Sequence, residues 1–332
     1  MQLDFVIPGL FDRLHDWSRS YATLPTFPTL ERALSVAATR RGFADGFEAT
    51  IWQQYDPGWQ AGDELPSAGH LSGIDGHHVF HASAVHLEAG MRDLILTSIA
   101  PLTHEESDEL HQHINQYLQP TGIRHHLDDS GNGYLVFDQR LTVRTTPLSQ
   151  VVGTGIADQM PSGDDAARLH QLGNELQMLL HSAPFNQRRE REGKLTANAI
   201  WLWGGGEAKR PLQPLHELSI SNHPLPQRCA QVSGQQHMTP PERFEPKLLD
   251  QTRRLLVVHD GLMAAAENDD IHSWQEAVAR IEQQWIAPMV EALRSGALTR
   301  LTVIPCHGKV FSLSRRSHWK IWRQPKSLAQ LL

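Results

Sequence analysis

The residues best suited to chemistry in this chain follow short apolar segments that predict buried strands. They are Asp12 after segment 3–7, His259 and Asp260 at the end of 254–259, and His307 after 301–304. If these strands are parallel neighbours, their carboxyl ends bring the side chains to one sheet edge, where open α/β proteins bind ligands. Carboxylates and imidazoles there could bind zinc or manganese. No HxH, HExxH or DxxxH spacing occurs at these positions, and among 20 histidines an ordinary structural role is the simpler interpretation of each.

The stretch 198–206 predicts a fourth strand of the same parallel sheet. Five apolar residues, Ala199 to Trp203, are typical of a strand buried on both faces. Three glycines then mark its carboxyl end, where the lack of a Cβ lets a ligand or another backbone approach. A simple turn against packed helices would explain them equally well. Pro211 and Pro214 follow instead of a helix N-terminus, which argues against a phosphate cradle of the P-loop or dinucleotide kind.

Composition restricts the class of protein. The chain has 332 residues, a formal net charge of −7 and a sequence pI near 6.3, so nucleic acid and anionic membrane are not expected partners. Cys229 and Cys306 show no CxxC spacing, which predicts a reducing compartment and argues against a disulfide framework or a structural zinc site. Neither a signal sequence nor an apolar run of ~18 residues is visible, and we expect a cytoplasmic protein.

The middle of the chain predicts a compact α+β module. Its strands form two predicted hairpins, 79–87 with 92–98 and 123–127 with 134–137. Between them, Thr103 and Glu106 form a capping box that begins a helix with an apolar face. A segment rich in Gly, Pro, Ser and Asp, 55–76, precedes the module and predicts a linker.

Helices and strands alternate on both sides of this module. Predicted helices cover 29–42, 164–182 and 273–293, the last with a kink at Pro288. Such alternation is typical of a parallel sheet covered by helices. We therefore predict an α/β core of residues 1–76 and 149–332 that share one sheet, with 77–148 inserted as an α+β cap.

Two charged stretches admit ordinary explanations. The segment from Arg188 to Glu192 predicts a solvated surface after a helix. The stretch from Arg315 to Arg323 alternates cations with indoles, as some single-strand nucleic-acid sites do. A terminal hairpin of 309–313 and 318–322, with one face in water, explains that pattern as well. GxSxG is absent, and Cys306 has no protease or phosphatase context, so we expect it to be a buried small residue.

Three stretches resemble motifs of the bacterial RpfE-type regulatory proteins, which are similar to the archaeal-type cofactor-independent phosphoglycerate mutases. They are Asn174 to His181, Pro184 to Asn186, and Asn198 to Gly206. The likeness extends over most of the chain. It implies a three-layer αβα core of the alkaline-phosphatase-like kind with an inserted cap, in agreement with the division predicted from periodicity.

The resemblance also implies an incomplete mutase metal site. Pro8 stands where the mutases have a metal-binding Asp, Met263 lies in a stretch that lacks the expected ligand His, and Cys306 replaces the Asp of an Asp-His pair. Phosphoryl transfer of this type needs a metal to activate the nucleophile and to stabilise the phosphoryl oxygens. We therefore expect no cofactor and no tightly bound dinuclear metal centre, and we assign no catalytic residue.

We predict a catalytically degenerate phosphoglycerate-mutase-like protein, a pseudoenzyme that regulates or binds a small polar or phosphorylated ligand or a protein partner. The candidate ligand-binding residues are Asp12, Arg13, Asn174, Asn198, Trp203, Gly204, Gly205, Gly206, Asp260 and His307. We expect the cap to close over them. We also expect a bulky residue at Gly205 to abolish ligand binding with little effect on stability.

Two alternatives stay open. In the first, Asp260 and His307, with Asp12, hold a divalent metal in a metal-dependent phosphomonoester mutase or hydrolase. In the second, the basic and aromatic C-terminus makes the protein a nucleic-acid-binding regulator.

Overall fold

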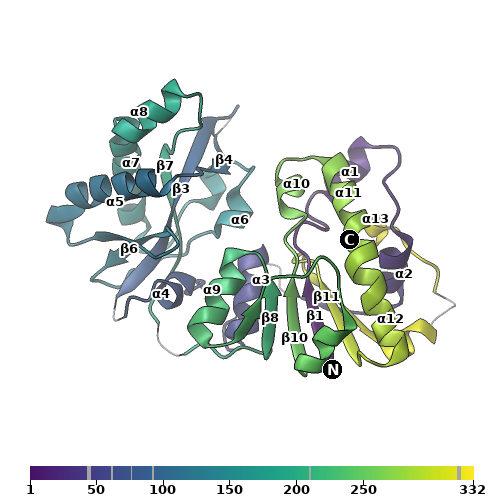
Figure 1. Cartoon of the computed structure of the whole chain (residues 1–332). Helices are drawn as coiled ribbons and strands as arrows, with labels where there is room; N and C mark the ends of the chain where they lie inside the picture. Colours follow the sequence, from purple (N-terminus) through teal and green to yellow (C-terminus); the bar gives the residue numbers. More distant parts are fainter. Residues whose placement is uncertain (43–45, 61–62, 76, 92, 209–210, 320–322) are drawn as a thin grey trace. The chain divides into compact units, whose positions relative to one another are not determined.

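The computed structural model describes residues 1–42, 46–60, 63–75, 77–91, 93–208, 211–319 and 323–332. They form two compact units, the first of Met1–Ala61 with Leu212–Leu332 and the second of Gly62–Pro211 (Figure 1). The second unit is thus inserted into the chain of the first. Among the described residues, no helix combines the length and apolar character needed to cross a lipid bilayer.

The first unit contains a seven-stranded sheet of order β2-β12-β11-β1-β10-β8-β9. The strands are β1 (Gln2–Val6), β2 (Ala38–Arg41), β8 (Leu218–Ser221), β9 (Gln236–Met238), β10 (Arg254–Val258), β11 (Arg300–Ile304) and β12 (Lys309–Ser314). β1 lies between β10 and β11 and is parallel to both, which confirms the predicted pairing of these three strands. β12 and β2 run antiparallel at one edge.

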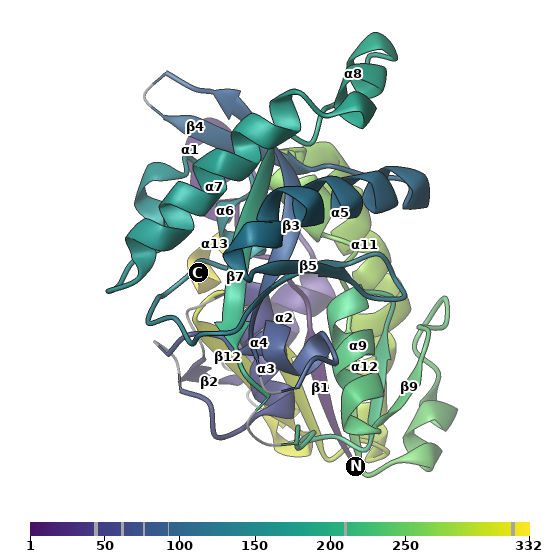
Figure 2. The ribbon, with the colours of Figure 1, turned by 90° about the vertical axis from the view of Figure 1, so that its left-hand side faces the viewer.

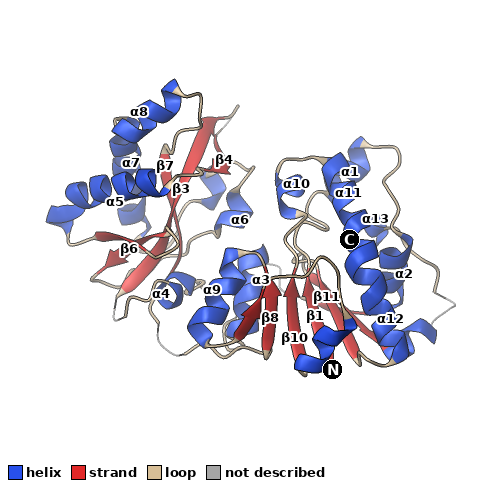
Figure 3. Cartoon of the chain, viewed as in Figure 1, coloured by secondary structure: helices blue, strands red, loops and turns tan. Residues whose placement is uncertain are grey.

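Helices cover both faces of this sheet. They are α1 (Leu14–Ser20), α2 (Pro28–Val36), α3 (Gly46–Tyr55), α9 (Pro224–Ser233), α10 (Met263–Glu267), α11 (Ile271–Ile281), α12 (Ala287–Ser295) and α13 (Leu328–Leu331). Leu3 and Phe5 of β1 pack in the main core with residues of α2, α11 and α12. Helices α3 and α9 lie on the opposite face (Figures 2 and 3). The first unit is therefore a three-layer αβα structure, as expected for the core.

Two predicted helices differ from the observed ones. The helix predicted over 29–42 ends at Val36, because the residues after it pair with β12 as strand β2. The helix predicted over 273–293 is divided by a π-helical turn, Glu282–Ile286, between α11 and α12. Pro288 is the second residue of α12, and its missing N–H explains a wider turn in place of a simple kink.

The second unit is organised around the long strand β3 (His78–Ala89). Its other strands are β4 (Leu94–Ile99), β5 (Arg124–Leu127), β6 (Gly133–Phe137) and β7 (Ala199–Gly206). All pairings in this sheet are antiparallel, and the two predicted hairpins are confirmed in part: β5 pairs with β6, and β3 with β4. Its helices are α4 (Ser67–Leu71), α5 (His104–Leu118), α6 (Leu148–Val151), α7 (Ala166–His181) and α8 (Pro184–Arg191).

The prediction that 199–203 belongs to the parallel sheet is wrong. β7 pairs antiparallel with β3 and is part of the second unit. The apolar run of β7 did correctly indicate burial on both faces of the strand. Ile200 and Leu202 pack in one core with α7, while Trp201 and Trp203 are buried on the other face. Burial on both faces indicates a covered strand, whatever the direction of its neighbours.

The unit boundaries also differ from those predicted. The first lies at 61/62, inside the predicted linker, in place of 76/77, and the second lies at 211/212 in place of 148/149. The inserted unit is larger because α7, α8 and β7 complete the core under β3. A module of two hairpins and one helix would have left the apolar face of the sheet uncovered.

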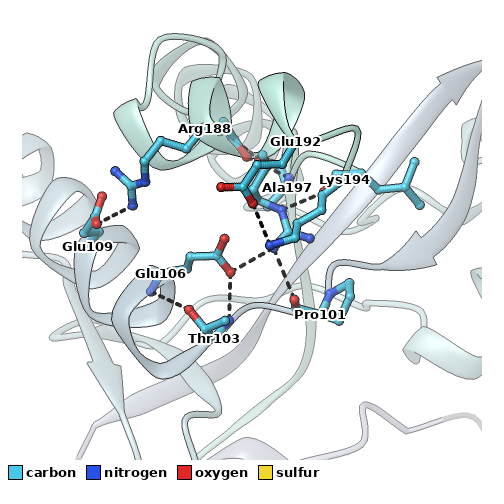
Figure 4. A network of polar contacts seen from close by, with 11 residues as sticks. Pro101, Thr103, Glu106, Glu109, Arg188, Glu192, Lys194 and Ala197 are labelled. Carbon is cyan, nitrogen blue, oxygen red and sulfur yellow. Dashed lines mark hydrogen bonds and ion pairs between the residues drawn. The ribbon is translucent and has the colours of Figure 1, made fainter.

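Two charged segments have other structures than predicted. Within Arg188 to Glu192, the Arg189 side chain is only 3% exposed, and its guanidinium forms an ion pair with Glu106 of α5. Figure 4 shows Glu106 in this polar network. At the C-terminus, β12 is confirmed as a strand, but Arg315–Trp319 forms a 3₁₀ turn and is no second hairpin strand. Residues 320–322 of that predicted strand lie outside the described residues.

Candidate functional site

The carboxyl edge of the first sheet brings together four of the predicted site residues. Because β1, β10 and β11 are parallel and in register, the segments that follow them emerge at one edge. These segments carry Asp12, Arg13, Asp260 and His307. The Arg13 side chain makes a hydrogen bond within the first unit, in which its Nε–H donates to the Ala266 carbonyl at 3.1 Å.

The turn after β1 fixes the position of Asp12. Gly9 has a φ of +81°, and a Cβ there would lie 2.8 Å from the carbonyl carbon of Leu262. Only glycine permits this close approach without strain. The Trp274 indole of α11 also donates to the Gly9 carbonyl at 2.8 Å. The Asp12 segment is thereby attached to the segment that follows β10.

Three acidic side chains share one electrostatic environment at this edge. Asp12 is exposed, yet the surrounding protein raises its pKa by desolvation, an effect that His307 and Arg13 only partly offset. The pKa of Glu267, on α10, is raised by desolvation and then by the charges of Glu48 and Asp12. Glu48 of α3 is itself buried. The charges of Glu48 and Asp12 therefore act together on Glu267 at this edge.

Two half-buried histidines, His223 after β8 and His259 after β10, are both affected by the charge of Asp260. Desolvation lowers the pKa of His223 and of His259, and Asp260 opposes that shift in both. His223 Nδ1 accepts from the Leu225 N–H at 3.2 Å, and His259 Nδ1 accepts from the Gly261 N–H at 3.3 Å. With Nδ1 acting as acceptor, the neutral ring carries its proton on Nε2. Both imidazoles can therefore donate a hydrogen bond to a ligand.

The side chains at this edge do not fit a metal centre. Among the described residues, no group of three or more His, Cys, Asp and Glu side chains is placed to hold a metal ion. Pro8 has no ligating side chain. Cys306 is buried at a φ of +59°, and desolvation raises the pKa of its thiol, which disfavours the thiolate that a metal needs. Its burial agrees with the expectation from the sequence.

The glycine triplet belongs to the second unit and not to this edge. The Gly204 N–H donates to Thr145 Oγ1 at 3.0 Å, and the Gly205 N–H donates to Glu64 Oε1 at 3.1 Å. A Cβ on Gly205 would lie 2.1 Å from the Phe80 ring, and one on Gly206 would lie 2.5 Å from Pro66. Side chains of the protein therefore fill the space that we had assigned to a ligand.

The remaining predicted site residues also lie in the second unit. Asn198 bonds the Leu87 backbone twice, accepting from its N–H at 2.7 Å and donating to its carbonyl at 2.8 Å. The Trp203 indole donates to Ser83 Oγ at 3.1 Å and stacks on His81 with ring centroids 4.1 Å apart. Asn174 is exposed on α7. The structure thus gives Asn198 and Trp203 structural contacts within the second unit.

Sequence reasoning missed Glu48, Glu267 and His223 at the candidate site. His223 lies two residues after the short strand β8, which was not predicted from the sequence. Glu48 and Glu267 lie on helices, where acidic residues are common and carry no distinguishing pattern. Only the fold brings them close to Asp12.

Comparison with known proteins gives partial sequence matches to one class of enzyme. No family model matches the chain. It is 42% identical over 71 residues to a probable 2,3-bisphosphoglycerate-independent phosphoglycerate mutase of Geobacter sulfurreducens, which covers 21% of this chain and 18% of that protein. It is 29% identical over 183 residues to the 2,3-bisphosphoglycerate-independent phosphoglycerate mutase of Methanothrix thermoacetophila, or 49% of this chain and 46% of the relative. These matches span less than half the length of the curated relatives.

A solved structure, that of the PH0037 protein from Pyrococcus horikoshii, has a similar fold. It superposes with a TM-score of 0.54 at 16% identity and covers 94% of this chain and 87% of that one. At this identity the likeness concerns the fold alone. The chain is therefore a mixed α/β protein with partial homology to the archaeal-type cofactor-independent phosphoglycerate mutases.

Proposed function

We propose that this chain is a catalytically degenerate relative of the phosphoglycerate mutases, with an alkaline-phosphatase-like core. In this proposal it acts as an RpfE-type regulatory protein that binds a small polar ligand at the carboxyl edge of the first sheet. One observation supports it above the others. Polar, partly desolvated groups gather at this edge, yet the described residues offer no set of three ligands for a metal. The second unit serves as the cap in this proposal.

The charges at the edge favour a particular ligand chemistry. The charges of Glu48 and Asp12 both act against the charge of Glu267, so a cationic group such as an ammonium would relieve this repulsion. A phosphorylated acid placed beside them would increase it. His223 and His259 offer Nε2–H donors for an oxygen of the ligand. We therefore favour a small cationic or zwitterionic metabolite over the phosphorylated ligand that the sequence also allowed.

The first experiment decides between binding and metal-dependent catalysis. Protein purified without chelators is analysed for metals and assayed for phosphoglycerate mutase and phosphomonoesterase activity with added Mn²⁺, Mg²⁺ or Zn²⁺. We expect neither two metals per chain nor turnover. Two metals per chain together with mutase activity would establish the enzyme alternative and overturn the proposal.

The second experiment identifies the ligand class. Thermal stabilisation is measured against matched panels of amines, zwitterions and phosphorylated acids, with Asp12→Asn as the site variant and Asp250→Asn as an exposed acidic control in the same unit. We expect cationic or zwitterionic ligands to stabilise the wild type and the control but not Asp12→Asn. Stabilisation by phosphorylated acids alone, or equal stabilisation of both variants, would contradict the assignment.

A further inference from the structure

Positive charge is concentrated in two segments of the first unit. Residues 32–42 and 309–332 together contain nine Lys and Arg residues and no Asp or Glu, so the rest of the chain has 21 basic residues against 37 acidic ones. A protein of net charge −7 therefore carries a locally basic region. This region begins at Lys309, two residues after His307 of the carboxyl edge, and extends away from that edge along β12 and β2.

The fold brings the two basic segments together. β2 pairs antiparallel with β12, with Arg41 opposite Lys309 (Figure 2). Arg323 donates to the backbone carbonyls of Ser35 and Ala37 at 3.3 and 3.2 Å, which attaches the C-terminal segment beside β2. We call the exposed cations of this region the basic margin: Arg40, Arg41, Arg315, Arg316, Arg323 and Lys326.

β2 is the outermost strand on this side of the described sheet, and all four of its residues are exposed. None of the ion pairs between described residues includes Arg40, Arg41, Arg315 or Arg316. The charge of Arg40 helps to lower the pKa of Asp4, but the Asp4 carboxylate is already hydrogen-bonded to His216 at 2.9 Å. The margin thus combines an exposed strand edge with cations that have no carboxylate partner among these residues.

We propose that an extended acidic segment of a partner protein adds to β2 as a further strand of this sheet. Exposed edge strands pair with other backbones in this way, and the backbone bonds supply affinity. Arg40 and Arg41 are consecutive on a strand, so they point to opposite faces. An acidic residue on either face of the added strand would therefore meet a cation, and Arg315 and Arg316 continue the positive charge beyond β12.

A polypeptide fits the margin better than a nucleic acid. Single-strand nucleic-acid sites rely on exposed aromatic platforms, whereas β2, with the sequence Ala-Thr-Arg-Arg, carries no aromatic side chain. A strand edge instead offers backbone donors and acceptors, which complement another polypeptide. Edge cations also occur as guards against aggregation. That explanation predicts no acidic partner, so a binding experiment separates the two.

The probe is a fluorescein-labelled peptide of about eight alternating Val and Glu residues, long enough for one strand. Its anisotropy is measured with the full chain at low and at physiological ionic strength. A second peptide has Pro in place of every other Val, which keeps the charge but removes backbone donors. The charge-reversal variant is Arg40→Glu with Arg41→Glu. Its matched control is Arg253→Glu with Arg254→Glu, two exposed arginines before and at the start of β10.

We expect the Val-Glu peptide to bind the wild type and the control variant. Its affinity should fall about tenfold or more in Arg40→Glu/Arg41→Glu, with folding checked by circular dichroism, and the Pro peptide should bind the wild type about tenfold more weakly. Equal binding of the two peptides, or equal binding to the two variants, would overturn strand addition at β2. So would the absence of any binding to the wild type. An oligothymidylate serves as the nucleic-acid probe. If it binds more tightly than the peptide, the basic margin is assigned to nucleic acid.

Discussion

The interior of the second unit around β7 and the carboxyl edge of the first sheet contain similar polar residues in opposite arrangements. In the second unit, the Glu64 carboxylate accepts from the Thr145 and Gly205 N–H groups at 2.8 and 3.1 Å. At the edge of the first sheet, the charges of Glu48 and Asp12 help to raise the pKa of Glu267. Polar groups with donors around them stabilise a fold, whereas groups that repel one another leave binding energy for a ligand. Here the hydrogen-bond and charge partners of a polar residue, more than its residue type, indicate whether it stabilises the fold or is available to bind a ligand.

The polar network of α5 and α8 is the extreme case of the first arrangement (Figure 4). Arg189 donates to Glu106 Oε2 at 2.8 Å and to the carbonyls of Pro101 and Leu195 at 3.2 and 2.7 Å. The same Glu106 oxygen accepts from the Thr103 N–H at 2.8 Å, which closes the capping box of α5. One buried cation thereby joins α8, α5 and the loop before β7.

The largest effect is expected from Arg189→Met. Removing the cation leaves the Glu106 carboxylate buried without its partner, so the free energy of unfolding should fall by about 3 to 5 kcal/mol. The neighbouring variant Arg188→Met is the control, because the side chains of its ion pair with Glu109 are 40% and 33% exposed, against 3% and 11% for Arg189 and Glu106, and its loss should be smaller. Urea unfolding of both variants measures the difference. Equal losses would mean that the buried pair is no more stabilising than a surface pair.

The same pair predicts a pH dependence. Desolvation alone would raise the pKa of Glu106, but the Thr103 N–H and Arg189 hold it below its ordinary value. A lowered carboxyl pKa contributes stability that is complete above the ordinary glutamate value and is lost as pH falls through the lower folded value. The advantage of the wild type over Arg189→Met should therefore shrink in acid. An advantage that stays constant or grows in acid would contradict this.

The next effect is expected from Gly205→Val, for which the sequence had predicted little change in stability. The added Cβ would overlap the Phe80 ring, so we expect a loss of about 1 to 3 kcal/mol. Gly173→Ala on α7 is the control, because no atom lies within 4 Å of its added Cβ. Replacing a helical glycine in open space should stabilise by about 0.5 to 1 kcal/mol. If Gly205→Val unfolds at the wild-type denaturant concentration, the triplet has space for a ligand after all.

Local sequence patterns predicted the helices and strands better than they predicted which of these elements pair or pack with one another. The capping box of Thr103 and Glu106 and the strand 199–203 were visible in sequence, because capping and burial depend on nearby residues. That Glu106 also binds Arg189, 83 positions along the chain, was not visible, and Arg189 was wrongly expected to be solvated. The sheet to which β7 belongs was misassigned for the same reason. Pairing over long sequence separations leaves no local signature.

The candidate site was predicted where it depended on strand order. Asp12, Asp260 and His307 were expected at one edge because each follows a strand of an apolar pattern, and the confirmed pairing of β1 with β10 and β11 places their segments there. Glu48 and Glu267 come from helices, so no strand pattern could reveal them. Their negative charge also changes the expected ligand chemistry, which the sequence alone had left open.

The smallest expected effect, that of Asp12→Asn, is the sharpest test of the comparison. This variant should stabilise the protein, whereas Arg189→Met and Gly205→Val should destabilise it. Since the folded-state pKa of Asp12 lies above the ordinary value of 3.8, the native state holds that proton more tightly than the unfolded chain. Stability should therefore fall as pH rises from the ordinary to the folded value, and the cost stays present at neutral pH. Asp12→Asn removes this cost, so without ligand it should raise the melting temperature at neutral pH by roughly 1 °C, with the gain vanishing in acid.

Asp250→Asn, another exposed acidic residue of the first unit, is the control and should leave the melting temperature unchanged at both pH values. Scanning calorimetry at neutral and acidic pH compares the two variants. A loss of stability in Asp12→Asn would mean that the backbone hydrogen bonds of Asp12 outweigh the cost of its desolvation. The carboxyl edge would then be as structural as the interior of the second unit, and the basic margin would become the stronger candidate for a binding surface.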